Sequence, residues 1–493
     1  MLSSFAIVAL SVPAFFTRFL NDMDYYALVG DKLLKGAILY RDALDTKPPL
    51  IFIHYAAIFQ LFGRDNLAAV KIVTMAWLML SAFAMYAIRR SLHPSSSNPE
   101  RVAALFVLAS FSGLGEDVLS SNTEVLSNLF VLGGLWSMVA DDFGGRPTRL
   151  FTAGALIGVA FLYRYQAGAA LAAYLTTMAV MPGRFSRPLR RLGFLAIGWL
   201  IPVAAVVAFY ARIDGLADLG LFLNYQSSYL RPHEVYRPLA FARITIVVFS
   251  QAPFLILSGW QAAVMCRRGG FERRDVFLLS FLAWSILPFF VGGHYFPHYI
   301  VQAIPALVLL TEERVSELAT ASSASPRAIA ALRYARRHML TNVVAFWIAN
   351  TAYYATVRTD PPSPNLARFI RDQTSPPDAV FLWTERSRIL FELDRSYATR
   401  FLTNEFLTGR LHGTRHRLPG ATAESARAAA IVDLWPVLLS DLEREKPRVI
   451  LDDPPDRSGF SIDRYPILAT FVHTYYEPAR TIDGFCVYLR KAS

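Results

Sequence analysis

Residues 21–63 read NDMDYYALVGDKLLKGAILYRDALDTKPPLIFIHYAAIFQLFG, and the interpretation of this stretch decides the topology of the whole chain. Its second part, Pro48–Gly63, is apolar enough to cross a membrane. If it were counted as a span, Arg89 and Arg90 at the end of the next apolar block would lie on the opposite side of the membrane from the other basic loops. We therefore predict that Pro48–Gly63 is a juxtamembrane helix that lies along one membrane face.

The chain has 493 residues and is 54% hydrophobic and 18% charged, whereas soluble domains hold about 25% charged residues. Most of its apolar residues lie in long blocks before residue 357. We interpret eleven blocks as membrane spans: residues 2–20, 66–88, 102–114, 123–140, 150–163, 167–182, 192–212, 241–265, 275–293, 299–311 and 338–357. The composition thus predicts a mostly helical membrane domain over residues 1–357 and a small soluble α/β domain over residues 358–493.

The loops that are rich in arginine all fall on one side of the membrane under this count. They hold Arg89 and Arg90, then Arg146 and Arg149, then Arg184, Arg187, Arg190 and Arg191, then Arg267, Arg268, Arg273 and Arg274, then Arg333, Arg336 and Arg337. Cytoplasmic loops collect Lys and Arg, so we predict that this side is the cytoplasm, with the N-terminus on the same side. The loops 21–65 and 213–240 and the domain 358–493 then lie outside. The first block lacks a basic start and a small-residue cleavage site, so we expect a retained span rather than a signal peptide.

Two long apolar stretches are predicted to be hairpins. Residues 150–182 have basic flanks and carry Arg164 in the middle. A charge at mid-membrane would cost several kcal/mol, whereas a hairpin of two short helices brings Arg164 to the outer surface. The same reasoning makes residues 275–311 a hairpin with His294 and His298 at its outer tip.

The net charge of +11 follows from the basic loops, and it does not indicate nucleic-acid binding. A nucleic-acid-binding protein would gather its basic residues on one soluble face, whereas these residues lie in short loops between apolar blocks. The chain has two cysteines, Cys266 and Cys486, which the topology places on opposite sides of the membrane, so we expect no disulfide. A Gly-rich phosphate loop is also missing from the sequence, so no nucleotide site is expected.

The loop after the first span carries acidic and basic groups close to the membrane boundary. Asp22 or Asp24 could accept a proton from an attacking hydroxyl, although acidic residues there could also simply cap a surface helix. That helix is predicted over Tyr25–Leu34, with Gly36 at its end. The prolines after Lys47 fix the chain direction and would hold its ammonium group at the level of a lipid phosphate.

This segment resembles the first outer loop of the GT-C glycosyltransferases, in particular the bacterial relatives of dolichyl-phosphate-mannose protein mannosyltransferase and of aminoarabinose transferase. The matching features are an acidic residue before Tyr26-Ala27, a glycine, Leu39-Tyr40-Arg41-Asp42, Lys47-Pro48-Pro49-Leu50 and the closing Phe62-Gly63. The family often has Asp-Glu at the acidic position, whereas this chain has Asp22-Met23-Asp24. Spacing back from Tyr26 favours Asp22 as the counterpart of the catalytic aspartate, and Asp24 is the alternative.

Other predicted outer tips extend the resemblance over most of the chain. Ser121-Asn122-Thr123-Glu124 looks like the second acidic motif of the family, Arg164 with Gln166 matches a basic residue at the fifth-span tip, and Pro297-His298-Tyr299 with Pro305 resembles another outer-face element. The tail segments Asn365–Arg371 and Asp378–Trp383 are similar to the start of the family's soluble domain.

The resemblance implies a GT-C-type enzyme of the bacterial inner membrane that moves a sugar from a polyprenyl-phosphate donor to an acceptor hydroxyl, with inversion, at the outer face. The acceptor would be a lipid, a glycan or a protein, as in lipopolysaccharide or protein glycosylation of the cell envelope. The catalytic candidates are Asp22, Asp24 and Glu124, and the candidates for binding the donor phosphate are Lys47, Arg164, His298 and Tyr299.

Other readings of these residues stay open from the sequence. Glu124 could be a helix N-terminal carboxylate favoured by the macrodipole, and Arg164 could extend to the interface without a partner. His294 and His298 have the spacing of a metal pair, but Pro297 interrupts it. Some family members use a metal, so a divalent ion is the one cofactor considered, and no residue is assigned to it. A secondary transporter, or a scaffold that binds a partner through residues 358–493, is the rival function.

Overall fold

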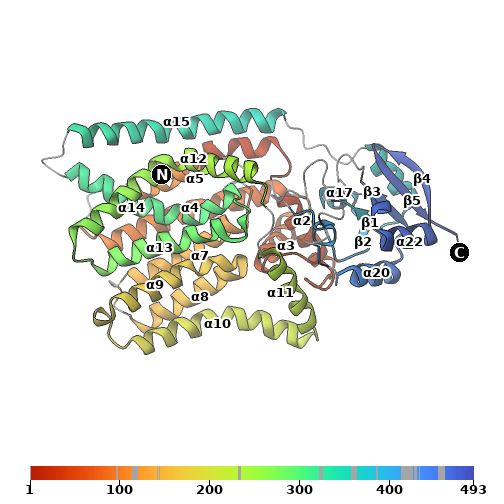
Figure 1. The fold of residues 1–493 in the computed structure, drawn as a ribbon, viewed down its shortest axis with the longest axis horizontal. Coiled ribbons are helices and arrows are strands. Elements are labelled where there is room, and N and C mark those ends of the chain that lie inside the picture. Colours follow the sequence, from red (N-terminus) through yellow and green to blue (C-terminus); the bar gives the residue numbers. More distant parts are fainter. Residues whose placement is uncertain are drawn as a thin grey trace.

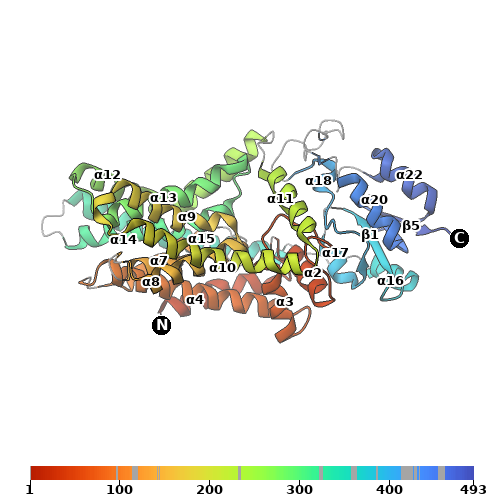
Figure 2. The ribbon, with the colours of Figure 1, turned by 90° about the horizontal axis from the view of Figure 1, so that it is seen from below.

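The computed structural model of the chain combines a long helical bundle with a small sheet domain beyond one end of the bundle (Figure 1). It describes residues 2–20, 22–95, 98–113, 120–140, 143, 145–230, 235–320, 326–356, 364–384, 387–411, 426, 430–431, 434–453 and 461–492. Figure 2 shows helices α2 (Met23–Leu34) and α11 (Leu216–Leu230) between the bundle and the sheet domain.

Each of the eleven predicted spans contains a helix. These helices are α1 (Leu2–Ser11) with η1 (Val12–Phe16), α4 (Leu67–Leu92), α5 (Arg101–Ser110), α7 (Thr123–Val139), α8 (Pro147–Tyr163), α9 (Ala169–Val180), α10 (Pro188–Arg212), α12 (Arg237–Arg268), α13 (Arg273–Phe290), α14 (Ile304–Thr320) and α15 (Pro326–Thr356). Among the described residues, four helices are long and apolar enough to cross a membrane by length and composition, namely Leu67–Leu92, Pro188–Arg212, Arg237–Arg268 and Arg273–Gly293. The fold is therefore a polytopic helical one, while the number of spans stays a prediction.

Local sequence signals fix several helix ends. The Asn66 side chain accepts a hydrogen bond of 3.0 Å from the backbone N–H of Ala69 and begins α4. A capping box between Glu272 and Asp275 begins α13. Gly36, with a φ of +90°, follows the end of α2, because a left-handed residue terminates a helix with least strain when it is glycine.

The predicted outer hairpins have the expected shape. Helices α8 and α9 are joined at Arg164 and the short η2 (Tyr165–Gly168). Helices α13 and α14 are joined by η4 (Val291–Gly293) and η5 (Pro297–Ala303), and His294 lies between these two 3-10 helices. The segment Pro48–Gly63 forms α3 (Leu50–Phe62), a helix of 13 residues, and its position along a membrane face stays a prediction.

The segment 213–240, predicted as a loop between two spans, contains the helix α11, which the sequence did not indicate. Tertiary contacts hold this helix against the first outer loop. The ring of Phe222 stacks on Tyr40 with a centroid distance of 4.2 Å, and Asp218 accepts a hydrogen bond of 2.8 Å from Arg41. Such contacts favour a helix where the local sequence, with Gly215, Gly220 and two serines, gives only a weak signal.

The basic helix ends gather at the end of the bundle that lies away from the sheet domain. The segment between α9 and α10, the C-terminal end of α14 and the N-terminal end of α15 lie at the left of Figure 1. Arg89 and His93 of the α4 end share a polar cavity with Arg268 and Arg274 of the α12–α13 turn. Their clustering agrees with the prediction that the basic loops share one side.

The described part of the C-terminal domain forms a five-stranded sheet with the strand order β2-β1-β3-β5-β4. The strands are β1 (Ala379–Trp383), β2 (Ser396–Tyr397), β3 (Val449–Asp452), β4 (Tyr476–Ile482) and β5 (Phe485–Arg490). Strands β2, β1 and β3 are parallel, whereas β5 and β4 form an antiparallel hairpin whose two turn residues, Asp483 and Gly484, have positive φ. Helices α16 (Pro364–Gln373), α17 (Ser387–Leu393), α18 (Glu405–Thr408), α20 (Leu434–Glu445) and α22 (Pro466–Tyr475) complete the α/β domain.

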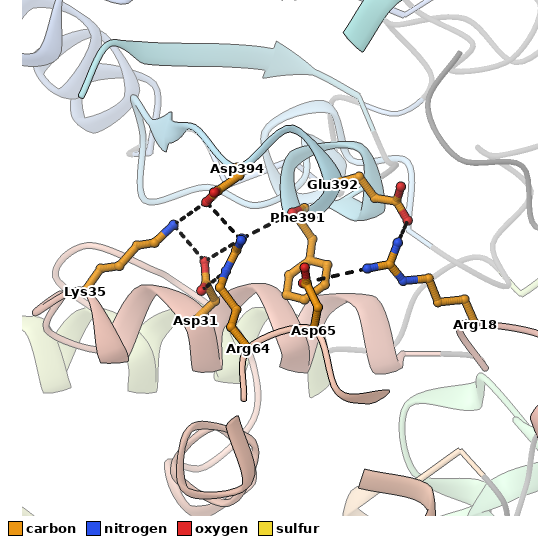
Figure 3. A network of polar contacts seen from close by, with 8 residues as sticks. All are labelled: Arg18, Asp31, Lys35, Arg64, Asp65, Phe391, Glu392 and Asp394. Carbon is orange, nitrogen blue, oxygen red and sulfur yellow. Dashed lines mark hydrogen bonds and ion pairs between the residues drawn. The ribbon is translucent and has the colours of Figure 1, made fainter. Parts of the chain in front are cut away.

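A network of charged residues attaches this domain to the bundle (Figure 3). We call it the interdomain ion cluster, and it consists of Arg18, Asp31, Lys35, Arg64, Asp65, Glu392 and Asp394. The ring of Phe391 lies in its middle, with the Arg64 guanidinium 5.4 Å from the ring centre. The cluster therefore fixes α17 on the outer face of α2.

Candidate active site

A cavity of about 170 Å³ lies where α2, α11, the α13–α14 hairpin and the C-terminal domain meet. It is lined by Asp22, Tyr25, Tyr26, Leu44, Asp45, Thr46, Lys47, Tyr225, Phe296, His298, Tyr299, Leu402, Thr403, Glu405 and Phe406. Carboxylates, a lysine and a histidine line it together with aromatic rings. The cavity brings together residues of segments that lie more than 300 positions apart in the chain.

Asp22 and Asp24 take different positions relative to this cavity. Asp22 precedes α2, makes no capping hydrogen bond to that helix, and lines the cavity. The hydroxyl group of Tyr26 donates to its carboxylate over 3.4 Å. Asp24 is buried inside the first turn, where it accepts a hydrogen bond from the backbone of Tyr25, and it does not line the cavity. The geometry therefore favours Asp22 over Asp24 as the group that meets a substrate.

The turn before the double proline is held by its own hydrogen bonds. The Asp45 carboxylate accepts from the backbone N–H of Lys47 over 2.9 Å, and the Tyr40 hydroxyl donates to the carbonyl oxygen of Lys47 over 2.9 Å. Because Pro48 and Pro49 add fixed φ angles, the direction of the Lys47 side chain is set by local structure. The Lys47 ammonium group therefore lines the cavity from a rigid base.

The charges of this turn are strongly coupled. Burial alone would lower the pKa of Lys47, but the nearby Tyr299, Asp22 and Asp45 raise it above its usual value, so the group is cationic at neutral pH. Burial raises the pKa of Asp45 to about 6, although Lys47 opposes this change. Asp45 thus titrates close to the physiological range, next to a permanent positive charge.

Behind the cavity, Glu124 and Arg164 form a buried ion pair. The carboxylate of Glu124 contacts the Arg164 guanidinium, accepts a hydrogen bond of 3.0 Å from Thr123, and lies 3.7 Å from the Nε2 atom of His298. The guanidinium also lies 4.5 Å from the ring centre of Tyr299. Neither Glu124 nor Arg164 lines the cavity, so they reach it through His298 and Tyr299.

Aromatic rings form the outer wall. Tyr225 of α11 packs on Phe406 of α18 with ring centres 4.1 Å apart, and Phe296 stacks on His298 at 5.4 Å. Helix α11 contributes one lining residue, Tyr225. Helix α3 packs behind α2, where Tyr55 contacts Tyr26, and none of its residues lines the cavity. The C-terminal domain supplies Leu402, Thr403, Glu405 and Phe406.

The sequence motifs did not indicate several of these lining residues. Thr403, Glu405 and Phe406 lie in a part of the tail without a recognisable motif, and Tyr225 lies in the segment 213–240, where no motif marks it. Only the close approach of α11 and α18 to the first outer loop could reveal them. Within the described ranges, no three His, Cys, Asp or Glu side chains are arranged to hold a metal ion, and Cys266 and Cys486 are both free thiols.

The helical bundle and the attached α/β domain together define a membrane protein of the GT-C fold type. Residues 46–210 match the model of a family described as dolichyl-phosphate-mannose-protein mannosyltransferase. A comparison with curated proteins gives no match.

Solved structures with a similar fold cover nearly the whole chain. The structure of ArnT from Cupriavidus metallidurans bound to undecaprenyl phosphate is 15% identical, covers 99% of this chain and 97% of that chain, and has a TM-score of 0.59. Its apo state is 16% identical, with coverages of 98% and 96% and a TM-score of 0.60. The Archaeoglobus fulgidus oligosaccharyltransferase in complex with Zn and sulfate is 13% identical, covers 98% of this chain and 73% of that chain, and has a TM-score of 0.51. These likenesses confirm the predicted fold, and the matching family is one of glycosyltransferases.

Proposed function

We propose that this protein is a membrane glycosyltransferase that moves a sugar from a polyprenyl-phosphate donor to an acceptor hydroxyl. The observation that carries the proposal is that a carboxylate without a capping role, Asp22, and a fixed cation, Lys47, line the same small cavity. One group suits proton removal and the other suits a leaving phosphate. The ArnT structure with bound undecaprenyl phosphate supports a polyprenyl carrier for the donor.

Asp22 is assigned as the general base. Its carboxylate takes the proton of the acceptor hydroxyl while the oxygen attacks the anomeric carbon of the donor sugar. The bond between that carbon and the phosphate oxygen breaks, and polyprenyl phosphate leaves with the bonding electrons. A single attack from the face opposite the leaving group inverts the anomeric configuration.

Lys47 and His298 are assigned to the leaving phosphate. Both line the cavity, and Lys47 keeps its positive charge because Tyr299, Asp22 and Asp45 surround it. A cation that is already in place stabilises the developing phosphate charge without reorganisation of the site. Tyr299, which borders the same cavity, separates this region from Arg164.

Arg164 and Glu124 are assigned a supporting electrostatic role. Because the guanidinium is paired with Glu124, its charge is largely compensated, and the carboxylate also holds His298 at 3.7 Å. The pair thereby orients His298 and the ring of Tyr299 toward the cavity. From the sequence, Arg164 was expected to bind the donor phosphate directly. We now propose that it acts indirectly, because it does not line the cavity.

The protein is further proposed to lie in the bacterial inner membrane with the cavity at the outer face. The clustering of the basic helix ends away from the C-terminal domain supports this orientation, since basic loops stay in the cytoplasm. The cavity would then receive donors from the outer leaflet.

The test uses the purified full chain in detergent with a panel of polyprenyl-phosphate sugars, and it measures release of polyprenyl phosphate. Asp22→Asn should lower turnover by about 100-fold or more, the usual effect of losing a general base, while the thermal stability stays near that of the wild type. Asp24→Asn should cause a smaller loss of turnover.

Equal activity of the wild type and Asp22→Asn would contradict the enzyme proposal and favour a transporter or a scaffold. The assay is run with divalent cations and with a chelator, because the two carboxylates beside Lys47 offer the oxygen ligands that hard cations prefer. Loss of turnover in the chelator would assign a divalent ion to the reaction.

A further inference from the structure

A short segment of the C-terminal domain closes the cavity from outside. We call residues 402–406 the roof segment, and four of its five residues, Leu402, Thr403, Glu405 and Phe406, line the cavity. The segment leads into α18, whose first residue is Glu405. A cavity wall that comes from a soluble domain contacts whatever approaches from the aqueous side.

Backbone contacts hold the start of the roof segment against the first outer loop. The backbone N–H of Leu44 donates to the carbonyl oxygen of Arg400 over 2.7 Å, and Leu44 forms a parallel bridge with Phe401. Arg400 is itself fixed by two hydrogen bonds to Asp441, of 2.9 and 2.8 Å. The roof segment is thus joined to the loop that carries Asp45 and Lys47.

The interdomain ion cluster attaches the same domain at a second place (Figure 3). Lys35 contacts Asp394 at 2.8 Å, and Arg18 contacts Glu392 at 2.9 Å. Buried Asp31 of α2 binds both Arg64 and Lys35. The C-terminal domain is thus joined to the bundle at two separate places, and one of them lies beside the roof segment.

The roof segment presents a carboxylate and an aromatic ring side by side. Phe406 packs on Tyr225, and Glu405 is the adjacent residue on the cavity wall. A sugar ring offers the complementary groups, namely a face of C–H groups that packs on aromatic rings and hydroxyls that donate to a carboxylate.

Resting on the proposed function, we propose that the roof segment is the acceptor subsite and that the acceptor is a carbohydrate. One sugar ring of the acceptor packs against Phe406 and Tyr225, and one of its hydroxyls donates to Glu405. A second hydroxyl of the acceptor faces Asp22, gives its proton to that carboxylate, and forms the new glycosidic bond as polyprenyl phosphate leaves.

The shape of the cavity favours a sugar ring over a peptide. Its volume of about 170 Å³ is below the range of roughly 300–1,000 Å³ that is usual for small-molecule pockets, so it suits one ring of a longer acceptor. An extended peptide is usually recognised through its backbone at a strand edge or in a groove. Here side chains, rather than a free strand edge, line the part of the cavity that the structure describes.

The test separates donor chemistry from acceptor recognition. Purified protein is supplied with a polyprenyl-phosphate sugar that it consumes, and with two acceptor panels, methyl glycosides and serine- or threonine-containing peptides. We expect transfer to methyl glycosides. Glu405→Gln and Phe406→Leu should raise the acceptor KM by about tenfold or more, as the loss of a hydrogen bond or of ring contact predicts, while the donor KM is unchanged.

Glu477→Gln is the matched control, because this exposed glutamate lies on β4, outside the cavity lining, and should behave as the wild type. The proposal is overturned if the peptides are glycosylated and the glycosides are not, or if Glu405→Gln is indistinguishable from Glu477→Gln. If the wild type consumes no donor at all, the proposed function is contradicted, and the acceptor subsite that rests on it is contradicted as well. Donor consumption with an unaltered acceptor KM in both roof variants overturns the subsite alone.

Discussion

The ammonium group of Lys71 donates a hydrogen bond of 2.6 Å to the carbonyl oxygen of Thr17. A second bond of 2.8 Å goes to the carbonyl oxygen of Ala14, so a buried lysine of α4 satisfies the end of the first helical segment. The chain reaches Asp22 only five residues after Thr17. A contact inside the bundle therefore sets the position of the assigned base.

Lys71→Met should destabilise the protein, because two buried carbonyl oxygens lose the hydrogen bond from the ammonium group, at a cost of about 1–3 kcal/mol each. Turnover should also fall, since the start of α2 is no longer tied to α4. Thermal unfolding in detergent and release of polyprenyl phosphate measure the two effects. Ile72→Val, at an exposed neighbouring position, should change neither. If Lys71→Met were as stable as the wild type, the two hydrogen bonds of the Lys71 ammonium group would not contribute to stability.

Lys47→Ala should lower kcat by about 100- to 1,000-fold, because a preorganised charge on the leaving group is lost. The protein should keep its thermal stability, since the turn is held by the bonds of Asp45 and Tyr40 to the Lys47 backbone, which the substitution retains. Lys446→Ala, at an exposed lysine of the C-terminal domain, is the control. An unchanged kcat in Lys47→Ala would remove Lys47 from the leaving-group role.

Single substitutions of the Glu124–Arg164 pair should each be strongly destabilising. Glu124 is 1% exposed and Arg164 is 5% exposed, so removing one partner leaves a buried charge uncompensated, at a cost of about 3–5 kcal/mol. Glu124→Leu and Arg164→Met combined should cost less than the sum of the two single changes. A double-mutant cycle on thermal unfolding measures this coupling. Additive effects would show that the ion pair between Glu124 and Arg164 does not account for the destabilisation.

Asp452 should make the stability of the C-terminal domain depend on pH. Burial raises its pKa to about 7, although a hydrogen bond from the backbone N–H of Ile462 opposes this change. Because the folded pKa lies above the unfolded value, the folded state binds the proton more tightly. The stabilisation of the folded state by proton binding to Asp452 is complete below about pH 4 and is lost as the pH rises through about 7.

Asp452→Asn should therefore stabilise the full chain at pH 8 by up to about 4 kcal/mol and have little effect at pH 4, since the amide cannot ionise and still accepts a hydrogen bond. Unfolding measured at both pH values checks this sign. A stabilisation that is equal at the two pH values would show that ionisation of Asp452 is not the cause.

The sequence predicted the parts of the fold that depend on local pattern. The end of α2 at Gly36 was predicted, because a helix-terminating glycine is a local signal. Helix α11 within residues 213–240 was not predicted, because it is stabilised by contacts of Phe222 and Asp218 with residues far away in the sequence.

The candidate site was predictable in part, because the predicted membrane topology restricts where each polar side chain lies. Asp22, Lys47 and His298 were all placed at the tips of outer segments, and all three line the cavity. Topology does not give the partner of a side chain, so the pairing of Arg164 with Glu124 was not foreseen. Glu405 and Phe406 were missed for the same reason, because their approach depends on how the C-terminal domain docks.

The roof segment follows every helix of the bundle in the chain, so the ribosome makes it after all of them. A nascent chain that ends at α15 already contains Asp22, Lys47 and His298, but one side of their cavity is still missing. The cavity is therefore complete only after the C-terminal domain has been made and has packed against the bundle.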